Sequence, residues 1–250
     1  ADAAMIERAV ALGVMWLHSF FQANNVPWES AVAKSWNKKM FSHIKTQADQ
    51  ASIDLAKEKG ACPDAEEYGI MERFSNKTAV APTASISIIC GGSSPGIEPI
   101  AANVFAHKTL SGTFTVRNRH LKMMLEEKKQ DNDEVWLSIL SNRGSVQHLD
   151  FLSDHEKDVY KTAFEIDQRW LIDLAGDRSE MIDQAQSLNV FLPADSDKSY
   201  LHEVHYAAWK KGVKSLYYCR SLSLQRAENS SNKPDLVEVK TLDDIAAESN

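Results

Sequence analysis

The second half of the chain alternates between two kinds of hydrophobic pattern. Helix-like stretches at residues 167–186 and 199–212 are each followed by a short apolar run, "SLNVFL" at 187–192 and "VKSLYY" at 213–218. Helices that alternate with apolar strands are typical of a layered α/β sheet or an α/β barrel. We therefore predict an α/β fold with strands at both runs. The length of 250 residues suits one large domain or two small ones, so it leaves the number of domains open.

The rest of the sequence predicts helices around one segment of different character. Residues 76–116 are rich in Thr, Ser, Val, Ile and Gly, which is typical of short strands joined by tight loops. Ser153 and Glu156 have the spacing of a capping box, which marks a helix start. Gly60 is placed to end a long helix in a left-handed cap. Periodic apolar residues predict helices at 3–22, 30–59, 120–129, 133–142 and 153–164.

The composition argues against several classes of protein. The formal net charge of −7 and the isoelectric point near 5.6 oppose a broad nucleic-acid-binding surface, which needs clustered Lys and Arg. No apolar run reaches the roughly 18 residues of a membrane-spanning helix, so we expect no membrane partner. The three cysteines, Cys62, Cys90 and Cys219, lie far apart without metal-ligand spacing, which favours a reducing cytoplasm. The first residues lack the pattern of a signal peptide.

Two loops in the Ser/Thr-rich segment are candidate binding sites. The loop "APTASIS" at 81–87 places small residues after a proline, which leaves backbone N–H groups uncovered for an anion; a plain Ser/Thr-rich turn or strand edge is the alternative. The loop "CGGSSPGIEP" at 90–99 is sharply shaped, but its glycines follow neither the P-loop order nor the dinucleotide-binding order. Its Glu98 is either an active-site carboxylate or a surface cap, and the second role is the more common.

Two adjacent tyrosines end the second apolar run. On a strand, Tyr217 and Tyr218 should face opposite sides, and spacing alone favours one core and one surface residue over two phenols that are oxidised in turn. His202 and His205 lie three residues apart on a predicted helix, but no third ligand completes a set, so we expect no metal site in this chain. The acids at 173, 177, 180 and 183 predict a solvated helix face.

Several short motifs, taken in order, resemble the large (alpha, catalytic) subunit of class I ribonucleotide reductases. Each fragment is weak alone, but the ordered set spans roughly residues 3–220. The motifs are "LAKEKGACP" at 55–63, "APTASIS" at 81–87, "GIEP" at 96–99, "LSGTFTVRN" at 110–118, "TAFEIDQRWLIDLA" at 162–175, "DQAQSLNVFL" at 183–192 and "AAWKKGVKSLYY" at 207–218. The resemblance implies a C-terminal portion of the family's ten-stranded α/β barrel over residues 1–220, and a polar, mobile tail is expected over 221–250.

The resemblance also implies an activity and a substrate site. The family is a ribonucleoside-diphosphate reductase, an oxidoreductase that forms 2'-deoxyribonucleoside diphosphates by thiyl-radical chemistry. Its Pro-Thr-Ala-Ser stretch lies at a helix N-terminus and binds the substrate diphosphate. That role carries over to Pro82, Thr83, Ala84, Ser85 and Ile86. Many relatives have an arginine just beyond the "GIEP" loop, where this chain has Ile100 and Ala101, so the contribution of that cation is in doubt.

The same resemblance assigns the adjacent tyrosines to radical transfer. In the family, a metallo-radical cofactor in a separate small (beta) subunit starts a radical that passes through tyrosines matching Tyr217 and Tyr218 to an active-site cysteine. This chain itself would bind no cofactor. The family's "NLCxE" pattern has no match here, and no cysteine pair for a thioredoxin- or glutaredoxin-type reductant follows Cys219. The resemblance therefore implies activity only with an N-terminal part of the large subunit and the small subunit, in a dimer of large subunits.

Two alternatives stay open. A cobalamin-dependent reductase of the same superfamily shares the Pro-Thr and "GIEP" features but needs no tyrosine pair, so "LYY" favours class I. A noncatalytic remnant that binds nucleotide or scaffolds an oligomer is opposed by the intact motifs at 82–85 and 217–218.

Overall fold

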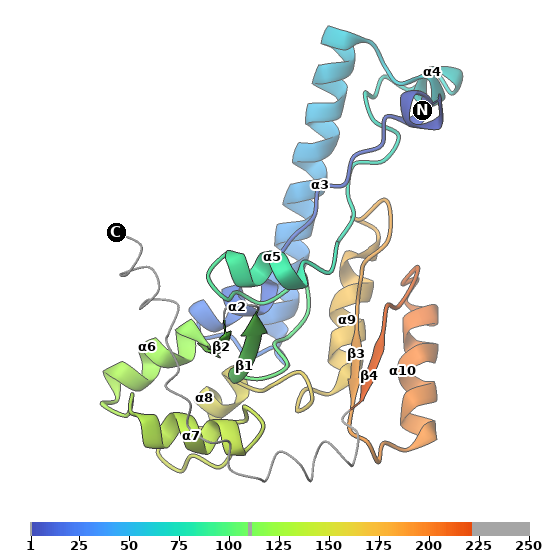
Figure 1. Cartoon of the computed structure of the whole chain (residues 1–250). Coiled ribbons are helices and arrows are strands. Elements are labelled where there is room, and N and C mark those ends of the chain that lie inside the picture. Colours follow the sequence, from blue (N-terminus) through green and yellow to red (C-terminus); the bar gives the residue numbers. More distant parts are fainter. Residues whose placement is uncertain (1, 110–111, 222–250) are drawn as a thin grey trace, which may run out of the picture.

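The computed structural model describes residues 2–109 and 112–221 of the chain, so the tail expected over 221–250 lies outside the described residues except for Ser221. Figure 1 shows a body of helices and short strands from which the long helix α3 (Ala31–Lys59) extends, with α1 (Asp2–Glu7) and α4 (Pro63–Glu67) near its far end. Within the described residues the strands form two separate two-stranded sheets. No helix in the described ranges is long and apolar enough to cross a membrane.

The N-terminal segment is not the single helix predicted over 3–22. Helix α1 ends at Glu7 and α2 covers Leu17–Ala23, with an extended segment between them. In that segment the amides of Val10 and Leu12 donate to the carbonyl oxygens of Asn76 and Lys77 at 2.9 and 2.8 Å. The apolar spacing was compatible with a helix, but these backbone groups pair with a distant segment instead, a tertiary contact that local periodicity does not encode.

The long helix predicted over 30–59 is confirmed. The Ser30 hydroxyl accepts a hydrogen bond from the amide of Ala33 at 3.1 Å and caps the N-terminus of α3, and Gly60 follows the last turn with φ of +81°. Its buried residues include Ala33, Asn37 and Phe41, whereas Trp36 is 41% exposed.

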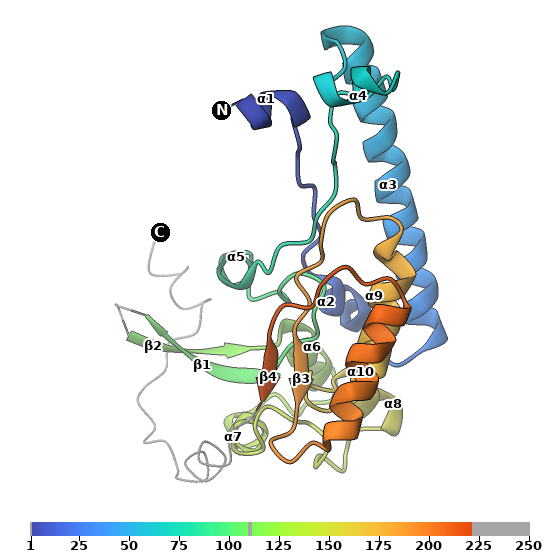
Figure 2. The same ribbon diagram turned by 90° about the vertical axis from the view of Figure 1, so that its right-hand side faces the viewer.

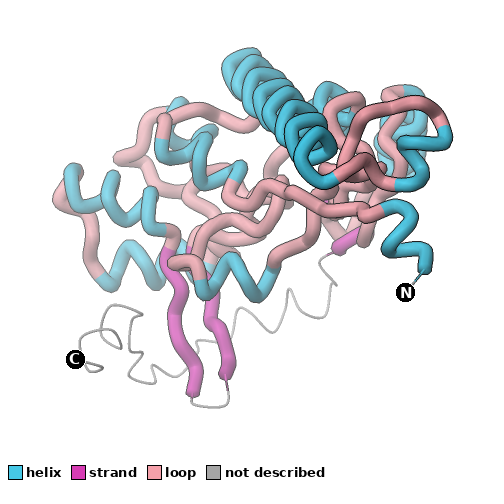
Figure 3. Tube along the Cα trace, turned by 90° about the horizontal axis from the view of Figure 1, so that it is seen from above, coloured by secondary structure: helices cyan, strands magenta, loops and turns pink. Residues whose placement is uncertain are grey.

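The middle of the chain combines one hairpin with short helices. Strands β1 (Val104–Thr109) and β2 (Gly112–Arg117) pair antiparallel, and Figure 3 shows this hairpin projecting from the body. The prediction of only short strands over 76–116 is wrong for α5 (Ala84–Ile89). The helices predicted at 120–129 and 133–142 are confirmed as α6 (Arg119–Glu127) and α7 (Asp133–Ser141). The Ser153 capping box is also confirmed, although α8 (Asp154–Val159) ends five residues earlier than predicted.

The C-terminal part is a helix–strand–helix–strand unit, which confirms an α/β arrangement. Helix α9 (Gln168–Ser179) leads to β3 (Val190–Leu192), and α10 (Lys198–Lys210) crosses to β4 (Cys219–Ser221). Strands β3 and β4 pair in parallel, and Figure 2 shows α10 beside them. The strand predicted at 187–192 is confirmed over its second half. The strand predicted at 213–218 is wrong, because β4 begins only at Cys219 after an irregular connection from the helix end.

Two main hydrophobic cores, besides a small cluster between α3 and α4, hold these elements together. The larger core packs α2, α3, α9, β3 and α10, and α9 contacts both α3 and α10. The smaller core packs the start of β1 against α6, α7 and the segment around α8. Fully buried members of the two cores include Phe21, Leu171, Leu174, Leu121, Leu125 and Ile139.

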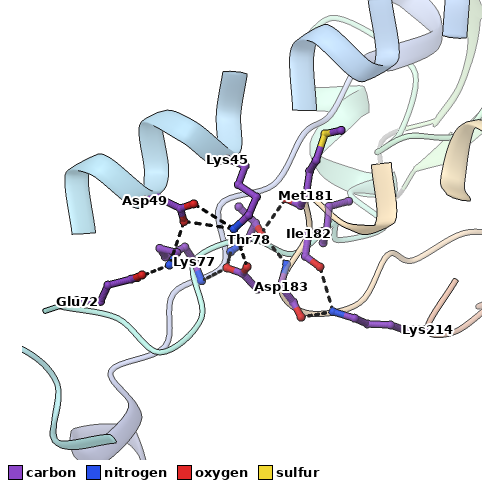
Figure 4. Close-up of polar contacts among 9 residues, drawn as sticks. All are labelled: Lys45, Asp49, Glu72, Lys77, Thr78, Met181, Ile182, Asp183 and Lys214. Carbon is purple, nitrogen blue, oxygen red and sulfur yellow. Dashed lines mark hydrogen bonds and ion pairs between the residues drawn. The ribbon is translucent and has the colours of Figure 1, made fainter. Parts of the chain in front are cut away.

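A charged network joins α3 to the segments around residues 78 and 183 (Figure 4). The Asp183 carboxylate accepts the amides of Lys77 and Thr78 at 2.8 and 3.2 Å and lies 3.5 Å from Lys45 Nζ. Lys77, only 7% exposed, pairs with Asp49 and Glu72. Asp183 was expected on a solvated helix face. That expectation is wrong, because α9 ends at Ser179 and Asp183 turns back onto the backbone of Lys77 and Thr78.

We expect Asp183→Asn to lower the free energy of unfolding by about 1–2 kcal/mol at neutral pH, because the buried amides lose a charged acceptor. Partial burial alone would raise the pKa of Asp183, but the Lys77 amide and the charges of Lys45 and Lys77 outweigh it and lower the pKa. The stability that this carboxylate supplies is thus present above its ordinary pKa and is lost as the pH falls through the lower pKa of the folded state. Urea unfolding of both forms should therefore show the difference shrinking below about pH 4. Asp195→Asn at an exposed acid is the control, and a pH-independent difference would contradict the charge effect.

Candidate active-site cleft

The predicted phosphate loop forms the start of helix α5. Thr83 precedes the helix in a left-handed conformation with φ of +52°, and its side-chain oxygen accepts the Gly96 amide at 2.7 Å. The amides of Ala84, Ser85 and Ile86 have no acceptor within the described part of the chain. All three residues are exposed. The loop therefore presents unpaired backbone donors and the Ser85 hydroxyl at one surface, as an anion site requires.

This surface borders a cleft of about 360 Å³. The wall of the cleft includes Pro82, Ala84 and Ser87 from the loop and helix, together with Glu98, Arg117 and Arg220. The structure thus brings the two predicted loops, 81–87 and 90–99, to one site. Two arginines from β2 and β4 reach the same cleft, although the residues after Pro99 supply no cation.

Glu98 is buried in the wall of this cleft, so the surface-cap role is wrong. It is 5% exposed, and it accepts hydrogen bonds from the backbone amide and the side-chain amide of Asn189 at 2.7 and 2.9 Å. Burial raises the pKa of Glu98, and the hydrogen bonds from Asn189 and the charge of Arg220 offset only part of this effect. The two N–H donors of Asn189 thus hold the Glu98 carboxylate in place.

The tyrosine pair lies immediately before β4. The Tyr217 amide donates to the Leu188 carbonyl oxygen at 2.8 Å, and the Tyr218 carbonyl oxygen accepts the Val190 amide at 2.8 Å, so the pair already follows the parallel pairing with β3. The two rings do not point to opposite sides. Their centroids are 4.2 Å apart at an interplanar angle of 54°, and the side chains are 49% and 55% exposed.

This geometry contradicts the assignment of one core and one surface tyrosine that spacing alone favoured. Both rings are half exposed and contact each other. The hydrogen bond with the Tyr218 side chain raises the pKa of Tyr217, and the electrostatic interaction with Tyr218 adds to the rise. Tyr217 therefore keeps its phenol proton at neutral pH, and it could release that proton on oxidation.

No histidine or cysteine among the described residues lines the cleft. His18 is buried, its Nδ1 accepts the Ile100 amide at 3.0 Å, and burial lowers its pKa to about 3, so it is neutral. His202 stacks on Tyr206, away from any metal-ligand set. Across residues 2–109 and 112–221, no three His, Cys, Asp or Glu side chains are grouped as metal ligands. Cys62 is buried, and Cys90 and Cys219 are exposed thiols.

Sequence reasoning missed Asn189, Arg117 and Arg220. Asn189 carried one signal, because a polar residue inside the apolar run "SLNVFL" must satisfy its amide when the strand is buried. The arginines carried none, since their place at the cleft depends on how β2 and β4 pack.

The chain matches one protein family over most of its length. Residues 1–69 and 64–219 match the family described as "Ribonucleotide reductase, barrel domain". The ribonucleoside-diphosphate reductase large subunit of Invertebrate iridescent virus 6 is 43% identical over 235 residues, which cover 92% of this chain and 24% of that protein. The protein of the same name from Invertebrate iridescent virus 3 is 41% identical over 241 residues, which cover 95% of this chain and 38% of that protein. The chain thus spans about a quarter to two fifths of the length of these relatives.

A solved structure agrees with this match. The class Id ribonucleotide reductase alpha subunit of Actinobacillus ureae superimposes with a TM-score of 0.81 and 37% sequence identity, covering 93% of this chain and 42% of that one. The likeness to a class I large subunit is therefore confirmed at the level of both sequence and fold. The chain belongs to the ribonucleotide reductase barrel-domain family, and its helices and strands are part of that barrel.

Proposed function

We propose that this chain supplies the substrate-phosphate loop and the radical-transfer tyrosines of a ribonucleoside-diphosphate reductase large subunit. The observation that carries the proposal is the direct contact of the Tyr217 and Tyr218 rings, 4.2 Å between centroids, on a backbone that is hydrogen-bonded to the wall of the cleft. Family membership supports the reductase activity, and the cleft supports a substrate site beside the pair.

The loop would hold the substrate diphosphate by its backbone. Pro82 and Thr83 shape the turn, and the amides of Ala84, Ser85 and Ile86 point out of the first turn of α5 with no competing acceptor among the described residues. Amides at a helix start carry partial positive charge and suit phosphate oxygens. Arg117 and Arg220 would add positive charge at the cleft. These residues position the substrate and take part in no bond breaking.

The pair would pass an oxidising equivalent between partners outside this chain. A metallo-radical cofactor in a small (beta) subunit would supply the one-electron oxidant. When one phenol is oxidised it loses an electron and a proton, and an adjacent phenol in ring contact can restore both with little rearrangement. The contact geometry supports this role over that of a cobalamin-dependent reductase or a noncatalytic remnant, neither of which needs two touching phenols.

The remaining machinery would lie outside the described residues. The proposal places the radical cysteine and the redox cysteines on a complementary N-terminal part of the large subunit, and it takes electrons from a thioredoxin- or glutaredoxin-type reductant. We infer a dimer of large subunits that works with the small subunit in the cytoplasm.

Ser85→Glu should weaken binding of a ribonucleoside diphosphate to the assembled large subunit by about tenfold or more. A unit negative charge placed near the phosphates costs about 1–4 kcal/mol, depending on solvent access. Titration calorimetry measures the affinity, and Ser42→Glu, at an exposed serine of α3, is the matched control. Equal affinities of the two variants and the wild-type protein would rule out the loop as the phosphate site.

A further inference from the structure

Asn189 connects the cleft wall to the tyrosine pair through one side-chain amide. Its Nδ2 donates to Glu98 Oε2 at 2.9 Å, and its Oδ1 accepts the Tyr218 amide at 3.0 Å. Its own backbone amide donates to Glu98 Oε1 at 2.7 Å. Both polar atoms of the side-chain amide are therefore hydrogen-bonded, and Glu98 fixes which of the two atoms points at Tyr218.

The burial of these groups makes the arrangement specific. Asn189 is 3% exposed and Glu98 is 5% exposed. A buried amide or carboxylate without partners is costly, so a flipped amide, with its NH₂ facing the Tyr218 N–H, would be strongly disfavoured. The flip would leave two donors opposed and Glu98 Oε2 facing an oxygen. One orientation of Asn189 is thus stabilised over the other.

The same bridge extends to the phosphate loop. Thr83 accepts the Gly96 amide at 2.7 Å, and Glu98 follows two residues later in the tight turn closed by its own amide and Pro95. The Thr83–Gly96 hydrogen bond, the main chain from Gly96 to Glu98 and the hydrogen bonds of Asn189 therefore link Thr83 to Tyr218. Arg220, directly on β4 and lining the cleft, is the cation whose charge reaches Glu98.

We propose that Glu98 and Asn189 form a hydrogen-bonded bridge that sets the position of the Tyr217–Tyr218 pair relative to the substrate loop. Asn189 is a positioning residue, since it acts through the Tyr218 backbone and contacts no reacting atom. This inference rests on the proposed function of the pair, and it adds to that function a physical link between the place where substrate would bind and the place where the radical would arrive.

A pair of isosteric exchanges tests the bridge. In Glu98→Gln alone, the NH₂ group of the introduced glutamine faces the NH₂ group of Asn189, or the Asn189 amide flips. In Asn189→Asp alone, the introduced carboxyl group faces that of Glu98. The double variant, Glu98→Gln with Asn189→Asp, restores every bond: the introduced glutamine accepts the backbone amide of residue 189 and donates to the introduced aspartate, whose other oxygen accepts the Tyr218 amide. The net charge also returns to that of the wild-type protein.

Two measurements are needed. The first is hydrogen exchange of the Tyr218 amide, followed by NMR on the 250-residue chain carrying isotope-labelled tyrosine. The second is steady-state turnover of the assembled reductase. We expect each single variant to speed Tyr218 exchange by about tenfold or more, as loss of a buried hydrogen bond predicts, and to lower kcat by about tenfold with KM within about twofold. The double variant should recover both values.

The outcomes separate the bridge from the function on which it rests. Loss of turnover in Tyr217→Phe with wild-type exchange and turnover in both single variants overturns the bridge alone. Normal turnover in the Tyr→Phe variants overturns the proposed function, and Tyr218 exchange then decides the bridge by itself. A parallel rise of KM and fall of kcat in the single variants overturns positioning in favour of general loosening. If a single variant fails to fold, the double variant still decides, because unrecovered exchange there overturns the bridge.

Discussion

Tyr217→Phe and Tyr218→Phe are each expected to reduce turnover of the assembled reductase to background while leaving substrate affinity unchanged. Phenylalanine keeps the ring, and the main-chain bonds to Leu188 and Asn189 do not involve the phenol oxygen. What is lost is the O–H group, and with it the capacity to release an electron and a proton together. The proposed diphosphate contacts lie on the loop at 82–86, so binding should not respond.

The measurement is the rate of deoxyribonucleotide formation, paired with the dissociation constant of the ribonucleoside diphosphate. Tyr206→Phe is the matched control, because Tyr206 on α10 is 51% exposed, as the pair is, and also lies against aromatic rings, those of His202 and Trp209. It should turn over at the wild-type rate. Normal turnover in both pair variants would end the radical-transfer proposal, and a loss in all three would point to a general effect of removing exposed phenols.

The raised pKa of Tyr217 gives the turnover prediction a pH dependence. Because the hydrogen bond with Tyr218 raises the pKa of Tyr217, this phenol should begin to ionise at a higher pH than a free tyrosine does. Turnover in the wild-type protein should therefore show no loss from ionisation of Tyr217 below about pH 10. A fall at lower pH that Tyr206→Phe shares would have to come from another group.

The sequence predicted those parts of the fold that depend on local signals. Helix α3 has a Ser30 cap and a Gly60 stop, and α8 has the Ser153 box, so both ends of α3 and the start of α8 could be placed from neighbouring residues alone. The segment at 8–16 could not, because its backbone pairs with residues 76–79 far along the chain. The same holds for Asp183, whose partners Lys77 and Thr78 lie more than a hundred residues away.

The candidate site also contains residues that the sequence could predict and residues that only the fold brings together. The loop at 82–86 and the pair at 217–218 are contiguous motifs, and a family resemblance can identify them. Glu98 and Asn189 are separated by 91 residues, and each has a common alternative role when considered alone. Only the fold brings them together. The half-exposed, touching rings also contradict strand alternation, because the regular strand starts one residue after the pair.

Gly144→Ala should cause a large loss of stability, about 3 kcal/mol or more. Gly144 follows α7 with φ of +80°, and a Cβ there would lie 2.4 Å from Ala102 Cβ and 2.9 Å from the Asn103 nitrogen. The Gly144 carbonyl oxygen also accepts both the backbone and side-chain amides of Asn103, at 3.1 and 2.9 Å. The added methyl group would therefore combine an unfavourable backbone conformation with overlap against main chain that cannot easily move.

The same overlap should reach the cleft. Asn103 Oδ1 accepts the side-chain amide of Asn118 at 2.8 Å, and Ala102 and Asn118 both line the cleft wall. Gly212→Ala separates the two effects, because Gly212 also has positive φ, +69°, but its added Cβ would meet no atom within 4 Å. That variant should lose only about 1 kcal/mol, the cost of the conformation itself. Thermal and urea unfolding of the two variants give the comparison. Equal losses would show that the contact with Ala102 adds nothing, whereas a larger loss for Gly144→Ala, with weaker diphosphate binding, is the result that the packing requires.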